Sequence, residues 1–496
     1  MAKYYLGIDQ GTTGVTALLF DRHFVPIARG YREISQYYPA PGLSEHDPIQ
    51  LYDAVCDATA AAMRTAGAAA GDIIAIGIDH EGESAMLWDK TTGKPVYPAI
   101  VWQDRRTAER AKELADTHGA LFRERTALTP DSYFSATKLE WLLRHVPEAR
   151  RLQKEDKLLA GNMDAWILWN MTGHRAHKTD ASTASRTLLY NIETGAWDKE
   201  LCDICGIDPK ILPEVGDSMR RMGESDPKAF LGIKAPVTAL LNDQQAALLG
   251  QGCVEKGMLK TTYGTGCFML MHTGTAPIRS KNGLLTTVAW QREGQREYAL
   301  DGGVYTAGSA TQWLRDGLKI ITSAKESGPL ALSVKDNGGV YFVPAFTGLA
   351  APHWDPYASG MMIGLNGGTT RAHIVRATSE SIAYQVADLA VAMERDAGTV
   401  IRSMRCDGGA TGDPFLMQFQ ADILNIPLEV PAFREATAQG SALAAAITLG
   451  DATPATARSL KRECKRYEPK MSREERETLL CQWHRAVERA KDWRRE

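Results

Sequence analysis

YLGIDQGTTGVTALLF, Tyr5 to Phe20, reads as a strand, a Gly/Thr turn and a second strand, and this pattern predicts a β-hairpin. The chain repeats the pattern as GMLKTTYGTGCFMLM, Gly257 to Met271, after a glycine-rich stretch that begins at Gly250. An internal echo of this kind indicates two related halves. We therefore place a domain boundary near residue 250, with one domain over residues 1–250 and the other over residues 251–496.

Strands and helices alternate outside the two hairpins. In the first half, a helical pattern that ends on Gly67 precedes the apolar run IIAIGI, Ile73 to Ile78, and a second helical pattern ends on Gly119. Strands that alternate with helices are typical of an α/β architecture. A chain of 496 residues also exceeds what one hydrophobic core usually supports, which agrees with two large domains.

The composition favours a small-molecule ligand. The net charge of -3 and the pI near 6.4 show no basic bias, so we expect neither a nucleic acid nor a membrane as partner. The sequence shows no secretory signal pattern and no apolar run of membrane-spanning length, which predicts a cytoplasmic protein. Cys202 and Cys205 have C-x-x-C spacing but lack two further ligands, so reduced structural cysteines are favoured over a metal or redox site.

A cluster of ionisable residues follows the apolar run that ends at Ile78. The stretch GIDHEGESAML, Gly77 to Leu87, contains Asp79, His80, Glu81 and Glu83. Three interpretations are open: a metal site, a carboxylate pair for acid–base chemistry, or polar contacts to a hydroxyl-rich ligand.

Three Gly/Thr turns follow predicted strands: DQGTTG at residues 9–14, YGTGCF at 263–268 and DGGATG at 407–412. Such turns expose backbone N–H groups and hydroxyls that suit phosphate oxygens, although many glycine turns are plain turns. Asp9 beside the first turn is either a turn cap or a Mg²⁺ ligand. Asp243, which begins a predicted helix, is either a helix cap or a general base.

Longer stretches resemble a known family. YFSATKLEWLLRH, Tyr133 to His145, matches the first signature of the FGGY family of carbohydrate kinases, and residues 360–385 nearly match the second. Within that family DQGTT, NDQQAALLGQ, TYGTGCFMLM and WDPYA are similar to the glycerol kinase branch in order and spacing. The resemblance implies two ribonuclease-H-like domains of the actin and hexokinase type that flank a central catalytic cleft. It also implies an ATP- and Mg²⁺-dependent kinase for a small polyol, and a homodimer or homotetramer.

The same resemblance assigns site residues by matching position. Contacts to the ATP phosphates are expected from Thr12, Thr13, Gly14 and Thr265. The rest of the nucleotide site is expected to include Gly308, Gln312, Gly409 and Asp413. The polyol is expected to lie against Gly82, Glu83, Trp102, Tyr133, Asp243, Gln244 and Phe268. Asp243 is expected to act as the base, and Asp9 and Asp243 are the expected magnesium partners.

The chain departs from the glycerol kinase pattern at three of these places. Gly82 stands where that pattern has an arginine that grips substrate hydroxyls, Thr16 replaces another arginine, and Asp413 replaces an asparagine. A hydrogen bond to a charged group contributes ~1.5 to 3 kcal/mol, so an uncompensated loss at Gly82 would weaken glycerol binding. Glycine also opens volume, which raises a longer acceptor, such as a tetritol, pentitol or xylulose-like ketose, as an alternative to glycerol.

A more remote alternative is an actin-like or chaperone-like ATPase switch without a small acceptor. A switch protein needs no residues that line a polyol site. The matches at Trp102, Tyr133, Asp243, Gln244 and Phe268 therefore favour the kinase.

Overall fold

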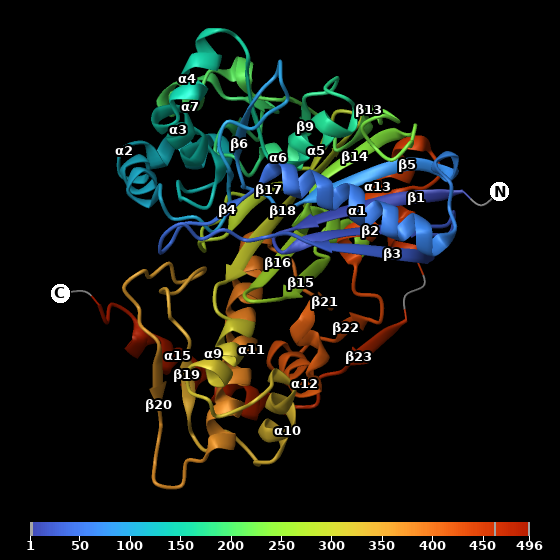
Figure 1. The fold of residues 1–496 in the computed structure, drawn as a ribbon. Helices are drawn as coiled ribbons and strands as arrows, with labels where there is room; N and C mark the ends of the chain where they lie inside the picture. Colours follow the sequence, from blue (N-terminus) through green and yellow to red (C-terminus); the bar gives the residue numbers. More distant parts are fainter. Residues whose placement is uncertain (1–2, 461–462, 495–496) are drawn as a thin grey trace.

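The computed structural model describes residues 3–460 and 463–494, and its first half is built on a six-stranded sheet (Figure 1). In spatial order the strands are β13 (Met219–Glu224), β14 (Pro236–Asn242), β5 (Ile73–His80), β1 (Tyr4–Gly11), β2 (Gly14–Phe20) and β3 (Pro26–Glu33). Strands β1, β2 and β3 form an antiparallel meander, whereas β5 and β14 run parallel to β1.

A seven-stranded sheet in the second half repeats this topology. Its strands in spatial order are β17 (Leu285–Arg292), β18 (Gln295–Val304), β16 (Cys267–Gly274), β15 (Leu259–Tyr263), β21 (Met404–Asp407), β22 (Leu428–Pro431) and β23 (Cys464–Tyr467). The antiparallel order β15, β16, β18 corresponds to β1, β2, β3, and β21 and β22 run parallel as β5 and β14 do. The predicted α/β fold with two related ribonuclease-H-like halves is confirmed.

Helices cover both faces of the first sheet. Helix α1 (Pro48–Ala66) begins after the Asp47 cap and packs on β2 and β3. Helix α13 (Ala436–Leu449) comes from late in the chain, yet it packs on β1, β5 and α8 (Asp243–Gly250), as its red ribbon among blue strands shows in Figure 1. A side chain at Gly7 or Gly77 would not fit under α13, because an ideal Cβ there would lie 2.1 Å from Ala438 O or 1.9 Å from Ser441 O.

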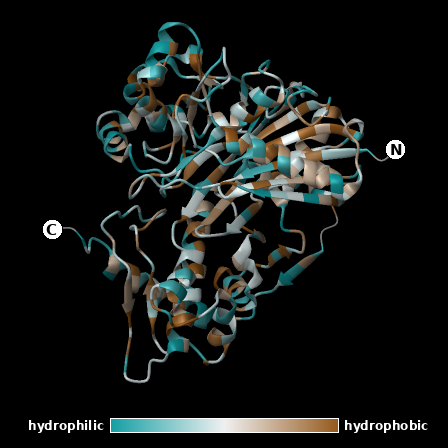
Figure 2. Cartoon of the chain, in the orientation of Figure 1, coloured by the Kyte–Doolittle hydropathy of each residue, from teal (hydrophilic) through white to brown (hydrophobic). Residues whose placement is uncertain are grey.

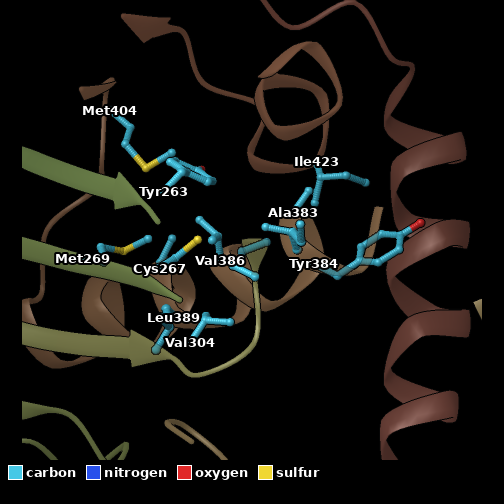
Figure 3. Close-up of a cluster of buried hydrophobic side chains, with 14 of the residues drawn as sticks. Tyr263, Cys267, Met269, Val304, Ala383, Tyr384, Val386, Leu389, Met404 and Ile423 are labelled. Atoms are coloured by element: carbon cyan, nitrogen blue, oxygen red, sulfur yellow. The ribbon is translucent and has the colours of Figure 1, made fainter. Parts of the chain in front are cut away.

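The core of the second half lies between its sheet and the long helix α11 (Arg371–Ala397). Figure 3 shows side chains of both elements meeting there, with Tyr263, Cys267 and Met269 from the sheet and Ala383, Val386 and Leu389 from the helix. The last helix, α15 (Arg473–Ala490), docks on this core through the buried Trp483 and Val487. Within the described ranges, no helix combines the length and apolar character that crossing a membrane requires.

A helical layer is inserted in the first half, with α2 (Ala108–Thr126), α3 (Ser135–His145), α4 (Pro147–Lys154) and α7 (Lys199–Ile204). Its outer faces are hydrophilic in Figure 2, and its inner faces share one apolar cluster. Cys202 and Cys205 are buried in this cluster as free thiols, as expected for structural cysteines. The layer is important for the site because the loop before α3 carries Tyr133.

Candidate active site

Three carboxylates lie at one edge of the first sheet. Asp9 in β1 is the register partner of Asp79 in β5, and Asp243 directly follows β14. Because β1, β5 and β14 run parallel, their carboxyl ends meet at the same edge. The sequence analysis proposed Asp9 and Asp243 but left Asp79 among several open interpretations, and the strand register supplies the missing information.

The three carboxylates influence one another's protonation. Burial raises the pKa of Asp9 to about 7; a hydrogen bond with Asp79 lowers it, and the charge of Asp243 raises it further. Burial and the charge of Asp9 raise the pKa of Asp79 well above its usual range, and its Oδ2 accepts a 2.5 Å hydrogen bond from Ser441 Oγ. The environment of Asp79 therefore favours its protonated form.

Asp243 is the first residue of α8 and follows the cap residue Asn242; Gln244 N donates to Asn242 Oδ1 at 3.3 Å and to Asp243 Oδ1 at 2.6 Å. Asp243 is half-buried; burial raises the pKa of its carboxyl, and the nearby Lys260 lowers it. Lys260 Nζ donates to Gln244 Oε1 at 2.5 Å and to Thr262 Oγ1 at 3.0 Å, and so joins α8 to the second sheet. Sequence reasoning missed Lys260, although a lysine within an apolar strand was a usable signal.

The aromatic residues predicted for polyol binding form one group. The Trp102 ring lies 5.7 Å from the Tyr133 ring and 6.5 Å from the Phe268 ring, both edge-on. Trp102 Nε1 also donates to Thr12 Oγ1 at 3.0 Å, so this group touches the first Gly/Thr turn. Residues of both halves therefore meet at Trp102.

The predicted nucleotide residues of the second half gather around the second Gly/Thr turn. Gly308 begins α9 (Gly308–Asp316) and donates its N–H to Gly264 O, while Thr265 O accepts from the backbone of Ser309. Gln312 is exposed on the same helix. A Cβ at Gly308 would lie 2.5 Å from Gly264 O, so only glycine allows this close approach.

Gly409 begins a short helical turn, Gly409–Gly412, that packs against β15. Gly409 follows Gly408, whose φ of +91° brings its backbone against Tyr263 O at the end of β15. Asp413 Oδ1 accepts from Phe415 N at 2.9 Å and caps α12 (Pro414–Leu424). The carboxylate at this departure from the family pattern therefore has a structural partner.

Thr16 is the other departure on the nucleotide side, and an arginine of a neighbouring strand contacts it. Arg29 in β3 donates to Thr16 Oγ1 at 3.3 Å and to Glu435 at 2.9 Å. The guanidinium missing from position 16 is thus present beside it.

His80 and Glu81 are held by protein partners. The His80 ring contacts Glu81 O at 2.8 Å and Thr183 Oγ1 at 2.9 Å, and His46 Nδ1 lies 3.1 Å from Glu81 Oε1. In the part of the chain that the structure describes, no three His, Cys, Asp or Glu side chains are arranged to hold a metal ion by themselves.

The space beside Gly82 is filled. An ideal Cβ on Gly82 would lie 1.9 Å from Asn242 Nδ2, and Asn242 is almost fully buried. The expectation that glycine opens volume at this position is therefore wrong, because the Asn242 side chain occupies it. The argument from volume for an acceptor longer than glycerol is removed with it, whereas the argument from the missing arginine is not affected.

We expect Gly82→Ala to lower the free energy of unfolding by about 1 to 3 kcal/mol, because the added methyl forces the Asn242 cap to move. Denaturant unfolding of both variants measures this, with Gly71→Ala as control, since a Cβ at Gly71 meets no atom within 4 Å. Equal stability of the two variants would contradict the packing at Gly82.

Glu83 is held in an unusual conformation by an arginine that the sequence analysis did not single out. Its φ of +60° lies in the left-handed region, which non-glycine residues rarely adopt outside functional sites. Glu83 Oε1 accepts a 2.6 Å hydrogen bond from Arg186 Nε, and both side chains are 5% exposed. Burial raises the pKa of Glu83, and Arg186 lowers it.

Known proteins match nearly the whole chain. Models of the N-terminal and C-terminal domains of the FGGY family of carbohydrate kinases match residues 4–250 and 259–449. The chain is 48% identical to a glycerol kinase of Nitratidesulfovibrio vulgaris (Miyazaki F) over 502 residues, covering 100% of both chains. It is 49% identical to a glycerol kinase of Trichlorobacter lovleyi over 495 residues, covering 99% of each.

Among solved structures, the crystal structure of Plasmodium falciparum glycerol kinase with ADP superposes with a TM-score of 0.91 at 32% identity. The match covers 99% of this chain and 98% of that one. Both halves of the fold and nearly all of the sequence are thus shared with these kinases. The chain belongs to the FGGY family of carbohydrate kinases.

Proposed function

We propose that this kinase transfers the terminal phosphoryl group of ATP to a terminal hydroxyl of glycerol and forms glycerol 3-phosphate. The observation that carries the proposal is the placement of Asp243, half-buried at the start of α8, where its charge acts on Asp9 and the charge of Lys260 acts on it. Relatives that are 46–49% identical over their full length and named glycerol kinase support the choice of acceptor.

Asp243 is the proposed general base. A carboxylate whose pKa is raised by burial accepts a proton more readily, and this one sits where it can orient the attacking hydroxyl. Phosphoryl transfer depends on positioning and charge neutralisation more than on covalent help, so one carboxylate is sufficient. Trp102 and Phe268 would pack on the carbon chain of glycerol and keep water away from the phosphoryl group.

The donors proposed for ATP belong to the two Gly/Thr turns. Thr12, Thr13 and Gly14 lie in the first turn and Thr265 in the second, where backbone N–H groups can bind phosphate oxygens. Gly308, Gln312, Gly409 and Asp413 would line the remaining part of the nucleotide site. The solved relative that carries ADP supports the use of ATP.

A magnesium ion fits the carboxylate edge. The charge of Asp243 raises the pKa of Asp9 and so makes the ionised Asp9 carboxylate costlier, and a cation would offset that cost. Mg²⁺ usually keeps waters and takes substrate phosphates beside one or two carboxylates, which suits a site without three protein ligands. When bound, it would neutralise charge on the ATP phosphates.

Initial rates of ATP-dependent phosphorylation across glycerol, erythritol, xylitol and xylulose test the acceptor. We expect kcat/KM for glycerol to exceed the others by at least about tenfold, because Asn242 fills the space beside Gly82 that a longer chain would need. A preference for a four- or five-carbon acceptor would refute the proposal that glycerol is the acceptor. ATP hydrolysis that no acceptor stimulates would instead indicate a switch ATPase.

A further inference from the structure

Position 82 cannot supply the arginine that glycerol kinases use to hold substrate hydroxyls. Gly82 has no side chain, and Asn242 occupies the direction that one would take. Asn242 is also fixed in place, since its side chain accepts from Gln244 N as the cap of α8. If this enzyme binds glycerol, the donor has to come from another element.

Arg186 brings a guanidinium to the same residues. It follows α6 (Ala181–Ala184), and its Nε donates to Glu83 Oε1 at 2.6 Å. Its guanidinium carbon lies 5.6 Å from the centre of the Tyr133 ring. Glu83 and Tyr133 are two of the residues proposed to line the glycerol site.

Arg186 also has bonding capacity left for a ligand. Its Nη1 forms an ion pair with Asp301 Oδ2 in β18 at 2.8 Å, outside hydrogen-bond geometry. A guanidinium carries five N–H donors, of which Glu83 takes one. The donors that neither carboxylate takes can bind a substrate hydroxyl.

We propose that Arg186 donates to a hydroxyl of the acceptor and fulfils the role that Gly82 cannot. This inference rests on the proposed function and adds the residue that selects the acceptor. Two flanking carboxylates, Glu83 and Asp301, face the single positive charge of Arg186. The excess of negative charge favours a neutral polyhydroxy acceptor over an acidic or phosphorylated one.

The competing explanation is structural: Arg186 joins the first half, through Glu83, to Asp301 of the second half. If Arg186 only joined the two halves, its substitution would lower stability and change kcat/KM for all acceptors alike. If Arg186 binds the acceptor, its substitution would lower kcat/KM for an acceptor that carries the bonded hydroxyl and leave kcat/KM unchanged for one that lacks it.

The test compares Arg186→Gln with Arg376→Gln. Arg376 is a matched control because it also pairs with a buried glutamate, Glu380 at 2.7 Å, and lies over an aromatic ring, Phe415 at 5.1 Å, in the core of the second half. KM and kcat are measured for glycerol, propane-1,2-diol, propane-1,3-diol and ATP. Thermal unfolding is followed for each variant.

We expect Arg186→Gln to raise the KM for glycerol roughly ten- to a hundredfold and to leave the KM for ATP within about threefold. One of the two diols lacks the bonded hydroxyl, and for that diol the wild type and Arg186→Gln should have nearly equal kcat/KM. Arg376→Gln should lower stability without changing the KM for glycerol.

Two results would overturn the inference while leaving the function intact: an unchanged KM for glycerol, or the same fractional loss for glycerol and both diols. If Arg186→Gln does not fold, the same kinetic comparison is made with Arg186→Lys, because lysine keeps the charge and loses the planar fork. A wild-type enzyme that does not phosphorylate glycerol would refute the proposed function instead.

Discussion

Asp243→Asn should lower kcat for glycerol phosphorylation by about 10²- to 10⁴-fold, the usual contribution of a general base. The amide has nearly the same shape but cannot accept the proton of the attacking hydroxyl. The helix start should stay satisfied, because Asn242 Oδ1 accepts from Gln244 N and an asparagine at position 243 keeps an oxygen that can accept from the same N–H. Steady-state kinetics with saturating glycerol and ATP measure the loss.

Asp198→Asn is the control for this variant. Asp198 also stands at a helix start, where its side chain accepts from Glu200 N and Leu201 N, but it lies outside the proposed site. We expect its kcat to be unchanged. A fall of less than about fivefold in Asp243→Asn would exclude the role as base.

Asp9→Asn should lower kcat/KM for MgATP by roughly a hundred- to a thousandfold, because a bound metal ion contributes several kcal/mol of charge stabilisation in the transition state. The same residue predicts a pH dependence. The pKa of Asp9 rises from 3.8 to about 7 in the folded protein, so wild-type kcat/KM should fall roughly tenfold per unit below pH 7.

The pH dependence of stability has the opposite sign to that of kcat/KM. Between about pH 4 and 7 the folded protein holds a proton on Asp9 that the unfolded chain has released. The stabilisation that this proton provides is fully present below the pKa of Asp9 in the unfolded chain and is lost as the pH rises through about 7. Added Mg²⁺ favours the ionised carboxylate, so the stabilisation of the folded protein by Mg²⁺ should grow from pH 5 to pH 8.

Thermal unfolding of the protein with and without Mg²⁺ at these two pH values checks this expectation. Asp9→Asn should lose most of the magnesium response. Glu380→Gln, which removes a buried carboxylate of raised pKa in the second half, should keep it. Magnesium stabilisation that does not change with pH would rule out Asp9 as its partner.

Much of the fold was accessible from the sequence because hairpins and glycine turns are local. The echo between Tyr5–Phe20 and Gly257–Met271 predicted two related halves, and both sheets repeat the same strand order. Helix α13 was not predictable in this way. Its place on β1 and β5 depends on contacts between residues more than 350 positions apart, such as Ser441 Oγ donating to Asp79 Oδ2.

The residues of the site also fall into two groups: those that belong to short sequence patterns and those that only tertiary contacts bring to the site. Asp9, Asp243 and the Gly/Thr turns are short patterns at strand ends, so the sequence and its family resemblance could indicate their chemistry. Arg186 belongs to no such pattern and reaches Glu83 across 103 positions. Its importance depends on Asn242, which fills the space beside Gly82.

The sequence alone therefore determined the family, the two related halves and the carboxylates at the strand ends, because each is encoded in neighbouring residues. Only the tertiary structure decided that Gly82 leaves no free space, that Asp79 shares the environment of Asp9, and that an arginine stands beside Glu83. Packing and electrostatic coupling act through space, and distance along the chain does not reveal them.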